Sequence, residues 1–186
     1  MFQKTVALLI LGTSLSALSQ STGQGFKPTT PDAYVEVSLN TLNYTQTGLR
    51  VSPTALRTVV GKHVGPTFAY EGMLALGPTM ASSTADGQPA QLKIDPLLAG
   101  YLKARKELAP GLEVFGRLGA ASMVKKTDGA YFNGQASSER LGSVSYGLGV
   151  KIRINRDTSF VTDYTSYYNR KDVTVDGLSL GLSFAY

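Results

Sequence analysis

From residue 33 to the last residue, apolar and polar side chains alternate along the chain with a period of two. That is the spacing of side chains on opposite faces of a β-strand, and it differs from the 3.6-residue period of an amphipathic helix. The pattern predicts eight strands. They span residues 33–44, 54–64, 67–77, 97–106, 112–124, 141–154, 158–169 and 174–186.

In each predicted strand one face is apolar and the other collects the charged side chains. Ten charged residues fall on the second face: Glu36, Arg57, Glu71, Lys103, Arg105, Glu113, Arg117, Lys151, Arg153 and Asp163. The exceptions, Lys62, Lys106 and Asp176, all lie near strand ends. Such alternation is typical of a soluble barrel with an apolar interior, and also of an outer-membrane barrel with apolar residues toward lipid. Alternation alone does not separate these two architectures.

Strand length and proline placement favour the membrane. Segments of 10 to 14 residues exceed the roughly five or six residues of soluble strands and cover the roughly 9 to 11 that cross a membrane at a tilt. All prolines fall outside the predicted strands, as a closed barrel requires, because it has no edge on which a missing N–H is harmless. They are Pro28, Pro31, Pro53, Pro66, Pro78, Pro89, Pro96 and Pro110.

Aromatic residues and connection lengths point the same way. Aromatic rings near strand ends suit the two headgroup zones: Tyr34, Tyr44, Phe68, Phe160, Tyr168 and Tyr186. Long connections (45–53, 78–96, 125–140) tend to alternate with short ones (65–66, 107–111, 155–157), although the fourth outer loop, 170–173, is also short. Short periplasmic turns and longer external loops characterise outer-membrane barrels. We therefore predict an all-β fold, an eight-stranded antiparallel transmembrane β-barrel in up-and-down meander order, monomeric because closure leaves no edge to pair.

The first residues have the layout of a secretory signal peptide. Lys4 precedes a largely apolar stretch, 5–18, that ends in the small-x-small pattern Ala17-Leu18-Ser19. This stretch is shorter than the roughly 20 residues that span a bilayer as a helix. The sequence thus predicts a cleaved signal peptide at 1–19, a short polar lead-in at 20–32 and a barrel domain at 33–186, and hence export to the cell outer membrane through the periplasm.

Composition removes much catalytic and metal chemistry. Hydrophobic residues make up 42% and charged residues 17% of the chain, which is too apolar for a disordered protein. With no Cys and one His, thiol nucleophiles, thiolate metal sites and most His-based metal sites are excluded. A net charge of +5 without a long basic run gives no indication of nucleic-acid binding. His63 precedes a predicted periplasmic turn and has no Ser spaced as a partner in its strand, so we expect an interfacial polar residue, no catalytic site and no cofactor.

The last strand ends with alternate apolar residues that close on an aromatic: Leu178, Leu180, Leu182, Phe184 and Tyr186. This resembles the C-terminal signal by which the barrel assembly machinery recognises outer-membrane barrels, although Phe is the more usual last residue. With 69–72 (AYEG), 115–119 (FGRLG), 146–149 (YGLG) and 175–177 (VDG), the chain from 33 to 186 resembles small barrels of the porin-family or opacity type, which are similar to the transmembrane domain of OmpA. The resemblance implies fold and location, whereas activities differ among such barrels.

The ten charges on the polar face would lie in the lumen. An eight-stranded barrel is just wide enough for side chains to fill it, so the charges could form a salt-bridge network that plugs it, with Glu71 and Arg117 paired near mid-barrel. Individually hydrated side chains near the mouths and a narrow ion path are the alternatives. Five cations border the predicted external loops and are candidate lipopolysaccharide contacts, or generic solvated charges: Lys125, Lys126, Arg140, Arg170 and Lys171.

These observations favour a structural or surface-interaction role, in which external loops meet lipopolysaccharide, other cells or host molecules. A narrow porin-like channel is the first alternative. The second is an enzyme acting on lipid A, which the resemblance would lead one to expect with its catalytic residues toward the outer rim. A soluble periplasmic barrel that binds a small apolar ligand is the third.

Overall fold

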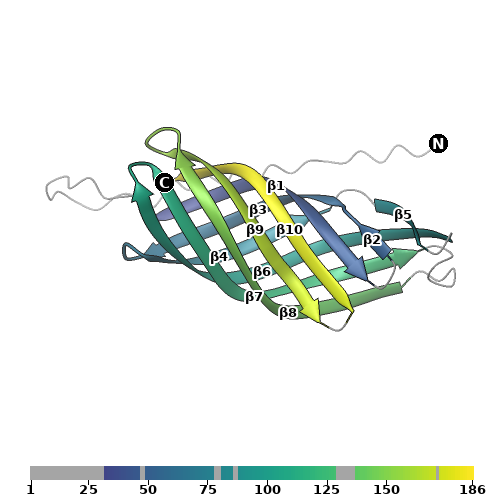
Figure 1. The fold of residues 1–186 in the computed structure, drawn as a ribbon. Helices are drawn as coiled ribbons and strands as arrows, with labels where there is room; N and C mark the ends of the chain where they lie inside the picture. The colour runs from purple at the N-terminus through teal and green to yellow at the C-terminus, as the bar shows by residue number, and fades with distance from the viewer. Residues whose placement is uncertain (1–31, 47–48, 78–80, 86–87, 129–136, 171) are drawn as a thin grey trace, which may run out of the picture.

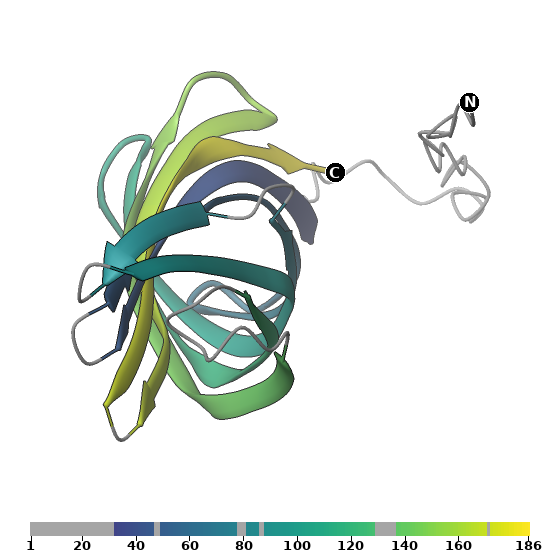
Figure 2. The ribbon, with the colours of Figure 1, turned by 90° about the vertical axis from the view of Figure 1, so that its right-hand side faces the viewer.

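The computed structural model describes residues 32–46, 49–77, 81–85, 88–128, 137–170 and 172–186. These residues form one antiparallel sheet that closes on itself (Figures 1 and 2). Its strands are β1 (Ala33–Gln46), β2 (Leu49–Val51), β3 (Thr54–Val64), β4 (Phe68–Leu76), β5 (Ala81–Ala85), β6 (Gln88–Ala109), β7 (Leu112–Asp128), β8 (Ser137–Arg153), β9 (Thr158–Arg170) and β10 (Val173–Ala185). The predicted signal peptide and lead-in lie outside the described residues, apart from Asp32.

Eight of these strands form the wall of a barrel in sequential meander order: β1, β3, β4, β6, β7, β8, β9 and β10. Each of these eight strands is called a stave. Neighbours along the chain pair throughout, and β1 closes the ring by pairing with β10, from Tyr34 opposite Ala185 to Gln46 opposite Val173. The N–H of Tyr186 also donates to the carbonyl of Ala33 at 3.0 Å. The predicted all-β, eight-stranded antiparallel barrel is confirmed. The described residues contain no helix that could cross a membrane.

The outer wall is apolar and the interior holds the charge. Large apolar side chains stand exposed on every stave, among them Leu39 (63%), Leu118 (61%) and Leu148 (73%). Charged side chains at alternate positions, such as Glu36, Arg57 and Lys103, are fully buried inside. The arrangement is therefore that of an outer-membrane barrel, with apolar side chains outside and charged side chains inside, because a soluble barrel would bury its apolar face instead.

The short turns β3–β4, β6–β7 and β8–β9 lie at the end of the barrel where β1 begins and β10 ends. In outer-membrane barrels this is the periplasmic end, and the other connections face outward. The long connections predicted from sequence are shorter than expected, because strands continue into them. Residues 45–53 contain β2, residues 78–96 contain β5 and the start of β6, and residues 125–140 contain the ends of β7 and β8.

Two expectations about single residues are wrong. Pro89 and Pro96 lie within β6, not outside the strands. Pro96 is tolerated because it stands where the β6–β7 ladder is irregular, between Ile94 and Leu97, so no regular ladder bond is lost there. Tyr34 and Tyr44 were expected among the rings at the membrane surfaces, but they are only 1% and 0% exposed because they point into the lumen.

Candidate functional site

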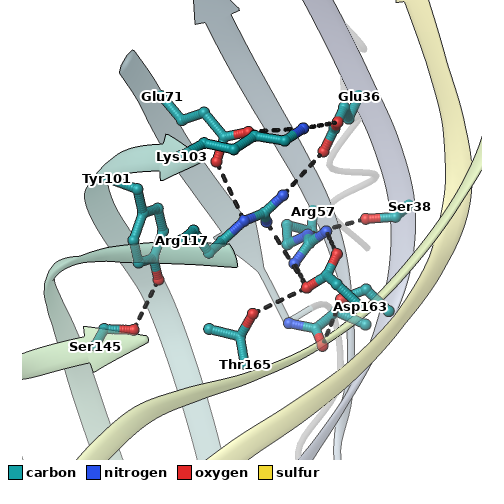
Figure 3. A network of polar contacts seen from close by, with 12 residues as sticks. Glu36, Ser38, Arg57, Glu71, Tyr101, Lys103, Arg117, Ser145, Asp163 and Thr165 are labelled. Atoms are coloured by element: carbon teal, nitrogen blue, oxygen red, sulfur yellow. Dashed lines mark hydrogen bonds and ion pairs between the residues drawn. The ribbon is translucent and has the colours of Figure 1, made fainter. Parts of the chain in front are cut away.

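The middle of the lumen is crossed by a network of ion pairs around Arg117 (Figure 3). Its Nε lies 3.2 Å from Glu71 Oε2, one terminal nitrogen lies 3.4 Å from Glu36 Oε2, and the other lies 3.7 Å from Asp163 Oδ1. All four side chains are fully buried and come from four different staves, β7, β4, β1 and β9. The guanidinium thus ties together opposite walls of the barrel, and it pairs with Glu71 as the sequence predicts.

Arg57 makes the second centre of the network. It binds Asp163 through both terminal nitrogens, at 2.8 Å and 2.5 Å, and its Nε donates to Ser38 Oγ at 3.0 Å. Thr165 Oγ1 donates to the same carboxylate at 2.9 Å. This two-pronged geometry is the strong form of an Arg–carboxylate pair, and it fixes the orientation of both side chains.

Lys103 stands opposite Arg117 in the β6–β7 ladder, and its Nζ is 3.5 Å from Glu36, 3.4 Å from Glu71 and 4.0 Å from Glu113. The ammonium also stands over the ring of Phe115, 4.0 Å from the centroid. The lysine therefore occupies a space bounded by carboxylates and an aromatic face, both of which attract a cation.

Two further side chains connect the network to its surroundings. Lys151 Nζ lies 3.4 Å from Glu36 and donates to Ser183 Oγ at 3.0 Å. The Tyr34 hydroxyl, deep in the lumen, donates to Glu71 Oε1 at 2.6 Å. Tyr34 thereby satisfies a buried carboxylate, which explains why this ring faces inward instead of toward the headgroups.

The formal charges of the fully buried side chains in the network balance. Arg57, Lys103 and Arg117 supply three positive charges, and Glu36, Glu71 and Asp163 supply three negative charges. Balance matters because an unpaired charge removed from water is far more costly than a paired one.

The remaining two predicted members lie nearer the periplasmic mouth. Arg105 binds Glu113 at 3.2 Å with 22% of its side chain exposed. Arg153 lies apart from the network: it faces Glu107 at 3.9 Å, and both side chains are more than half exposed. For these two arginines the alternative prediction, hydrated charges near a mouth, fits better than membership of the central network.

Above the network, toward the outer end, the lumen is filled by apolar side chains that the sequence reasoning missed. The buried cluster consists of Leu42, Tyr44, Val51, Ala55, Val59, Met73, Ala75, Leu97, Tyr101, Ala121, Met123, Leu141, Tyr167 and Val175. The signal that could have found it is the run of inward positions on the outer half of each strand, such as Leu42 and Tyr44 or Ala121 and Met123. The buried side chains of the lumen thus form two layers, one charged and one apolar.

Below the network, the periplasmic mouth holds two adjoining cavities of about 510 and 550 Å³. His63, Arg105, Glu113, Lys151, Arg153 and Ser159 line both of them. The His63 ring lies 4.9 Å from the Tyr34 ring, and its Nδ1 has no hydrogen-bond partner in the described part of the chain. No group of three or more His, Cys, Asp or Glu side chains among the described residues could hold a metal ion.

Two of the candidate surface contacts and all of the C-terminal signal residues lie on the outside. Arg140 and Arg170 are exposed on the outer parts of β8 and β9. Lys125 and Lys126 belong to the last four residues of β7, and their side chains are not among those that the structure describes. Lys171 lies outside the described residues. The residues expected to form the C-terminal signal are all on the lipid face: Leu178 (49% exposed), Leu180 (51%), Leu182 (39%), Phe184 (43%) and Tyr186 (56%).

A closed eight-stave barrel with an apolar exterior and a charged interior defines a bacterial outer-membrane β-barrel protein. The chain belongs to the outer membrane protein beta-barrel domain family, whose model matches residues 5–185. No curated protein sequence matches it.

Solved structures of small outer-membrane barrels share the fold. Neisserial surface protein A superposes with a TM-score of 0.65 at 11% identity, covering 83% of this chain and 97% of that one. Ail, the attachment invasion locus protein of Yersinia pestis, gives 0.61 at 13% identity, covering 84% and 99%. OprG of Pseudomonas aeruginosa gives 0.56 at 11% identity, covering 84% and 97%.

Proposed function

We propose that this protein is a closed outer-membrane anchor that presents its outer strands and loops to lipopolysaccharide, other cells or host molecules. The observation that carries the proposal is the two layers of buried side chains in the lumen. Ion pairs lie in its middle and apolar side chains in its outer half, which supports a lumen without a continuous polar path from one mouth to the other. A barrel that does not conduct acts through its surfaces.

The longest strands of the barrel extend at its outer end. Strands β6, β7 and β8 have 22, 17 and 17 residues, against 11 in β3 and 9 in β4. Crossing a bilayer takes roughly 9 to 11 residues, so the longer strands would extend past the membrane. Figure 1 shows β6, β7 and β8 reaching farther toward this end than the β9–β10 hairpin. Exposed Arg140 on β8 adds positive charge to this extension, and Lys125 and Lys126 belong to its β7 strand. Arg170 ends β9 and Lys171 follows it, so cations border both outer hairpins, which favours anionic partners such as lipid phosphates.

Ail offers a parallel. It is an attachment invasion locus protein by name, and it has been crystallised in complex with sucrose octasulfate, a heparin analogue, in a structure that superposes on this chain with a TM-score of 0.57 at 14% identity. A barrel of this fold can therefore bind a polyanion, and the outer cations of this chain would suit one.

Assembly and oligomeric state belong to the same proposal. The exposed row from Leu178 to Tyr186 would be recognised by the barrel assembly machinery. A barrel that has no unpaired strand edge within the membrane would act as a monomer. We propose no enzymatic activity. A lipid A-modifying activity would be revealed by mass spectrometry of lipid A from cells with and without the protein, and the proposal expects identical spectra.

The proposal is tested by removing the outer extension while leaving the barrel. Replacing residues 127–138 with a Gly-Ser linker of the same length should abolish adhesion of expressing cells to immobilised polyanion or host cells. A matched pair of variants separates the ends of the barrel: Arg140→Ser with Arg170→Ser should weaken adhesion, whereas Arg153→Ser with Arg156→Ser, an equal charge change at the periplasmic end, should not. Unchanged adhesion in the linker variant, with the protein shown to be folded and surface-exposed, would contradict the proposal.

A further inference from the structure

We propose that residues 137–145 of β8 form an open strand edge that takes up an extended, acidic polypeptide segment of a partner as an additional β-strand. The inference rests on the proposed surface role and names the kind of partner and the place where it would bind. Three observations carry it. The first is the point at which the β8–β9 ladder ends, the second is the direction of the backbone groups beyond that point, and the third is the set of side-chain contacts that keep the two strands apart there.

The two ladders of β8 end at different levels. Toward β7, the pairing continues without irregularity from Ile152 opposite Leu112 to Ser137 opposite Thr127. Toward β9, it runs from Arg153 opposite Ser159 only as far as Tyr146 opposite Ser166. Residues 137–145 therefore have a partner strand on one side only, within the part of the chain that the structure describes. The β9–β10 hairpin diverges from the end of β8 (Figures 1 and 2).

The direction of the free backbone groups follows from two hydrogen bonds at the periplasmic end. The N–H of Arg153 donates to Gly111 in the β6–β7 turn, on the β7 side, whereas the N–H of Ile154 donates to Thr158 on β9. In an antiparallel ladder successive residues direct their N–H and C=O groups to opposite neighbours. Even-numbered residues of β8 therefore address the β9 side. Beyond Tyr146, the groups that have no strand partner among the described residues belong to Ser138, Arg140, Gly142 and Val144.

Side chains hold the point at which the strands separate. Ser145 Oγ donates to the carbonyl of Ser166 at 2.7 Å and lies 2.8 Å from the Tyr101 hydroxyl. The β9–β10 register shifts between Val175 and Asp176, opposite Tyr168 and Ser166, and Tyr167 at this bulge turns its ring inward. Its hydroxyl accepts a hydrogen bond from Asn40 Nδ2 at 3.0 Å. The divergence of β9 from β8 is therefore built into the packed lumen.

The edge lies at or beyond the outer membrane surface. Tyr146, where the ladder ends, is 54% exposed on the outer wall, and exposed tyrosines mark the headgroup zone of such barrels. Free backbone groups are not tolerated in hydrocarbon but can exchange partners in water. The edge is thus placed where a peptide from outside can reach it.

The chemistry of the edge selects its occupant. A row of free N–H and C=O groups binds another extended backbone, and natural edges are otherwise protected by prolines, bulges or inward charges. Residues 137–145 (SSERLGSVS) contain no proline, and the β7–β8 ladder shows no bulge there. Arg140 is exposed on this segment and Arg170 on the diverging end of β9, so an acidic strand is favoured and a second copy of the same cationic edge is disfavoured.

The test compares two substitutions at Gly142 in the mature protein in lipid nanodiscs. A Cβ at this position meets only the carbonyl oxygen of Ala121, at 3.9 Å, so Gly142→Ala fits and keeps the N–H. Gly142→Pro removes an N–H that points toward the open edge and leaves the ladder with β7 intact. The probe is a capped, fluorescent peptide of about ten residues with alternating Val and Glu, a length that matches the edge.

We expect the parent and Gly142→Ala to bind this peptide equally, and Gly142→Pro to bind about tenfold or more weakly, as the loss of backbone hydrogen bonds dictates. Bound peptide should slow amide hydrogen exchange at Arg140, Gly142 and Val144. A Val-Lys peptide should bind more weakly than the Val-Glu peptide. Absence of binding, or equal binding by a correctly folded Gly142→Pro variant, would overturn the inference.

Cell adhesion separates this inference from the surface role on which it rests. If the linker replacement of 127–138 abolishes adhesion but Gly142→Pro leaves both adhesion and peptide binding unchanged, the surface role stands and the strand-edge inference falls. If neither variant affects adhesion, the surface role itself fails.

Discussion

At the scale of single residues, the balance of charge in the lumen makes Arg117 the most sensitive position. Replacing it with Leu leaves Glu36, Glu71 and Asp163 with less compensation inside the barrel. Breaking a buried ion pair by removing one partner costs about 3 to 5 kcal/mol. We expect Arg117→Leu to lower the free energy of unfolding by about that amount, measured by urea titration in lipid vesicles with the heat-modifiable gel shift as the readout.

Two controls distinguish charge imbalance from loss of packing. Arg117→Leu combined with Glu71→Leu restores equal numbers of positive and negative charges, so it should recover much of the lost stability. Arg153→Leu removes a cation from an exposed pair and should change the free energy by about 0 to 1 kcal/mol. Equal destabilisation by the single and the double variant would show that the network does not depend on its charge balance.

The close approach of the neighbouring backbone to Gly119 leads to a second prediction for a single residue. Gly119 faces the lumen, and a Cβ there would overlap the carbonyl of Gly100, with the Cα of Tyr101 only 2.9 Å away. Because those atoms belong to the paired strand β6, they cannot swing aside. Gly119→Ala should destabilise the barrel by about 1 to 3 kcal/mol. Gly72→Ala is the matched control, since nothing lies within 4 Å of its added Cβ on the outer wall; equal midpoints for the two variants would refute the prediction.

At the scale of strands, depth in the membrane decides what a charge costs. Leu148 lies mid-strand on the outer face of β8 and is 73% exposed, whereas Ile154, 61% exposed, follows the same strand at the periplasmic rim. We expect Leu148→Arg to destabilise by about 2 to 4 kcal/mol and Ile154→Arg by about 0 to 1 kcal/mol. Urea midpoints measured side by side check this difference, and similar values would contradict the placement of Leu148 in hydrocarbon.

The strands were predictable because burial on one face only imposes a period of two on the sequence. Their outer ends were not, because the alternation in the sequence fades there, as it does where β6 begins at Gln88 and β7 ends at Asp128. Pro96 was excluded from a strand by a rule that holds for regular ladders, whereas the ladder beside it is irregular.

The candidate site was predictable in its residue types more than in its arrangement. Alternation brought Glu71, Arg117 and the other lumen charges to one face, but which carboxylate meets which cation depends on the register across the ring, as in the pairing of Arg57 on β3 with Asp163 on β9. Tyr34 and Tyr44 were assigned to the membrane surface from their places near strand ends. Their parity, which they share with Glu36 and Ser38, was the better guide.

At the scale of the whole molecule, the three levels of the lumen have different chemistry. The periplasmic mouth is open and polar, the middle is a balanced charge network, and the outer half is an apolar core. In the proposed closed anchor, the network would seal the barrel against ions through its packed side chains, and the apolar layer would seal it by excluding water. Either layer by itself would then interrupt a continuous aqueous path.

Conductance in planar bilayers tests this double closure. The parent protein should give no steady current, and neither should Arg117→Ala, because the layer formed by Leu42, Tyr44, Met123 and Tyr167 remains in place above the altered network. Current is expected only when both layers are opened, as in Arg117→Ala combined with Tyr44→Gly and Tyr167→Gly. Insertion of each variant is verified by its heat-modifiable gel shift. A steady parent current that changes with Arg117→Ala alone would mean that the lumen conducts through the charged layer, and the role as a closed surface anchor would give way to that of a narrow channel.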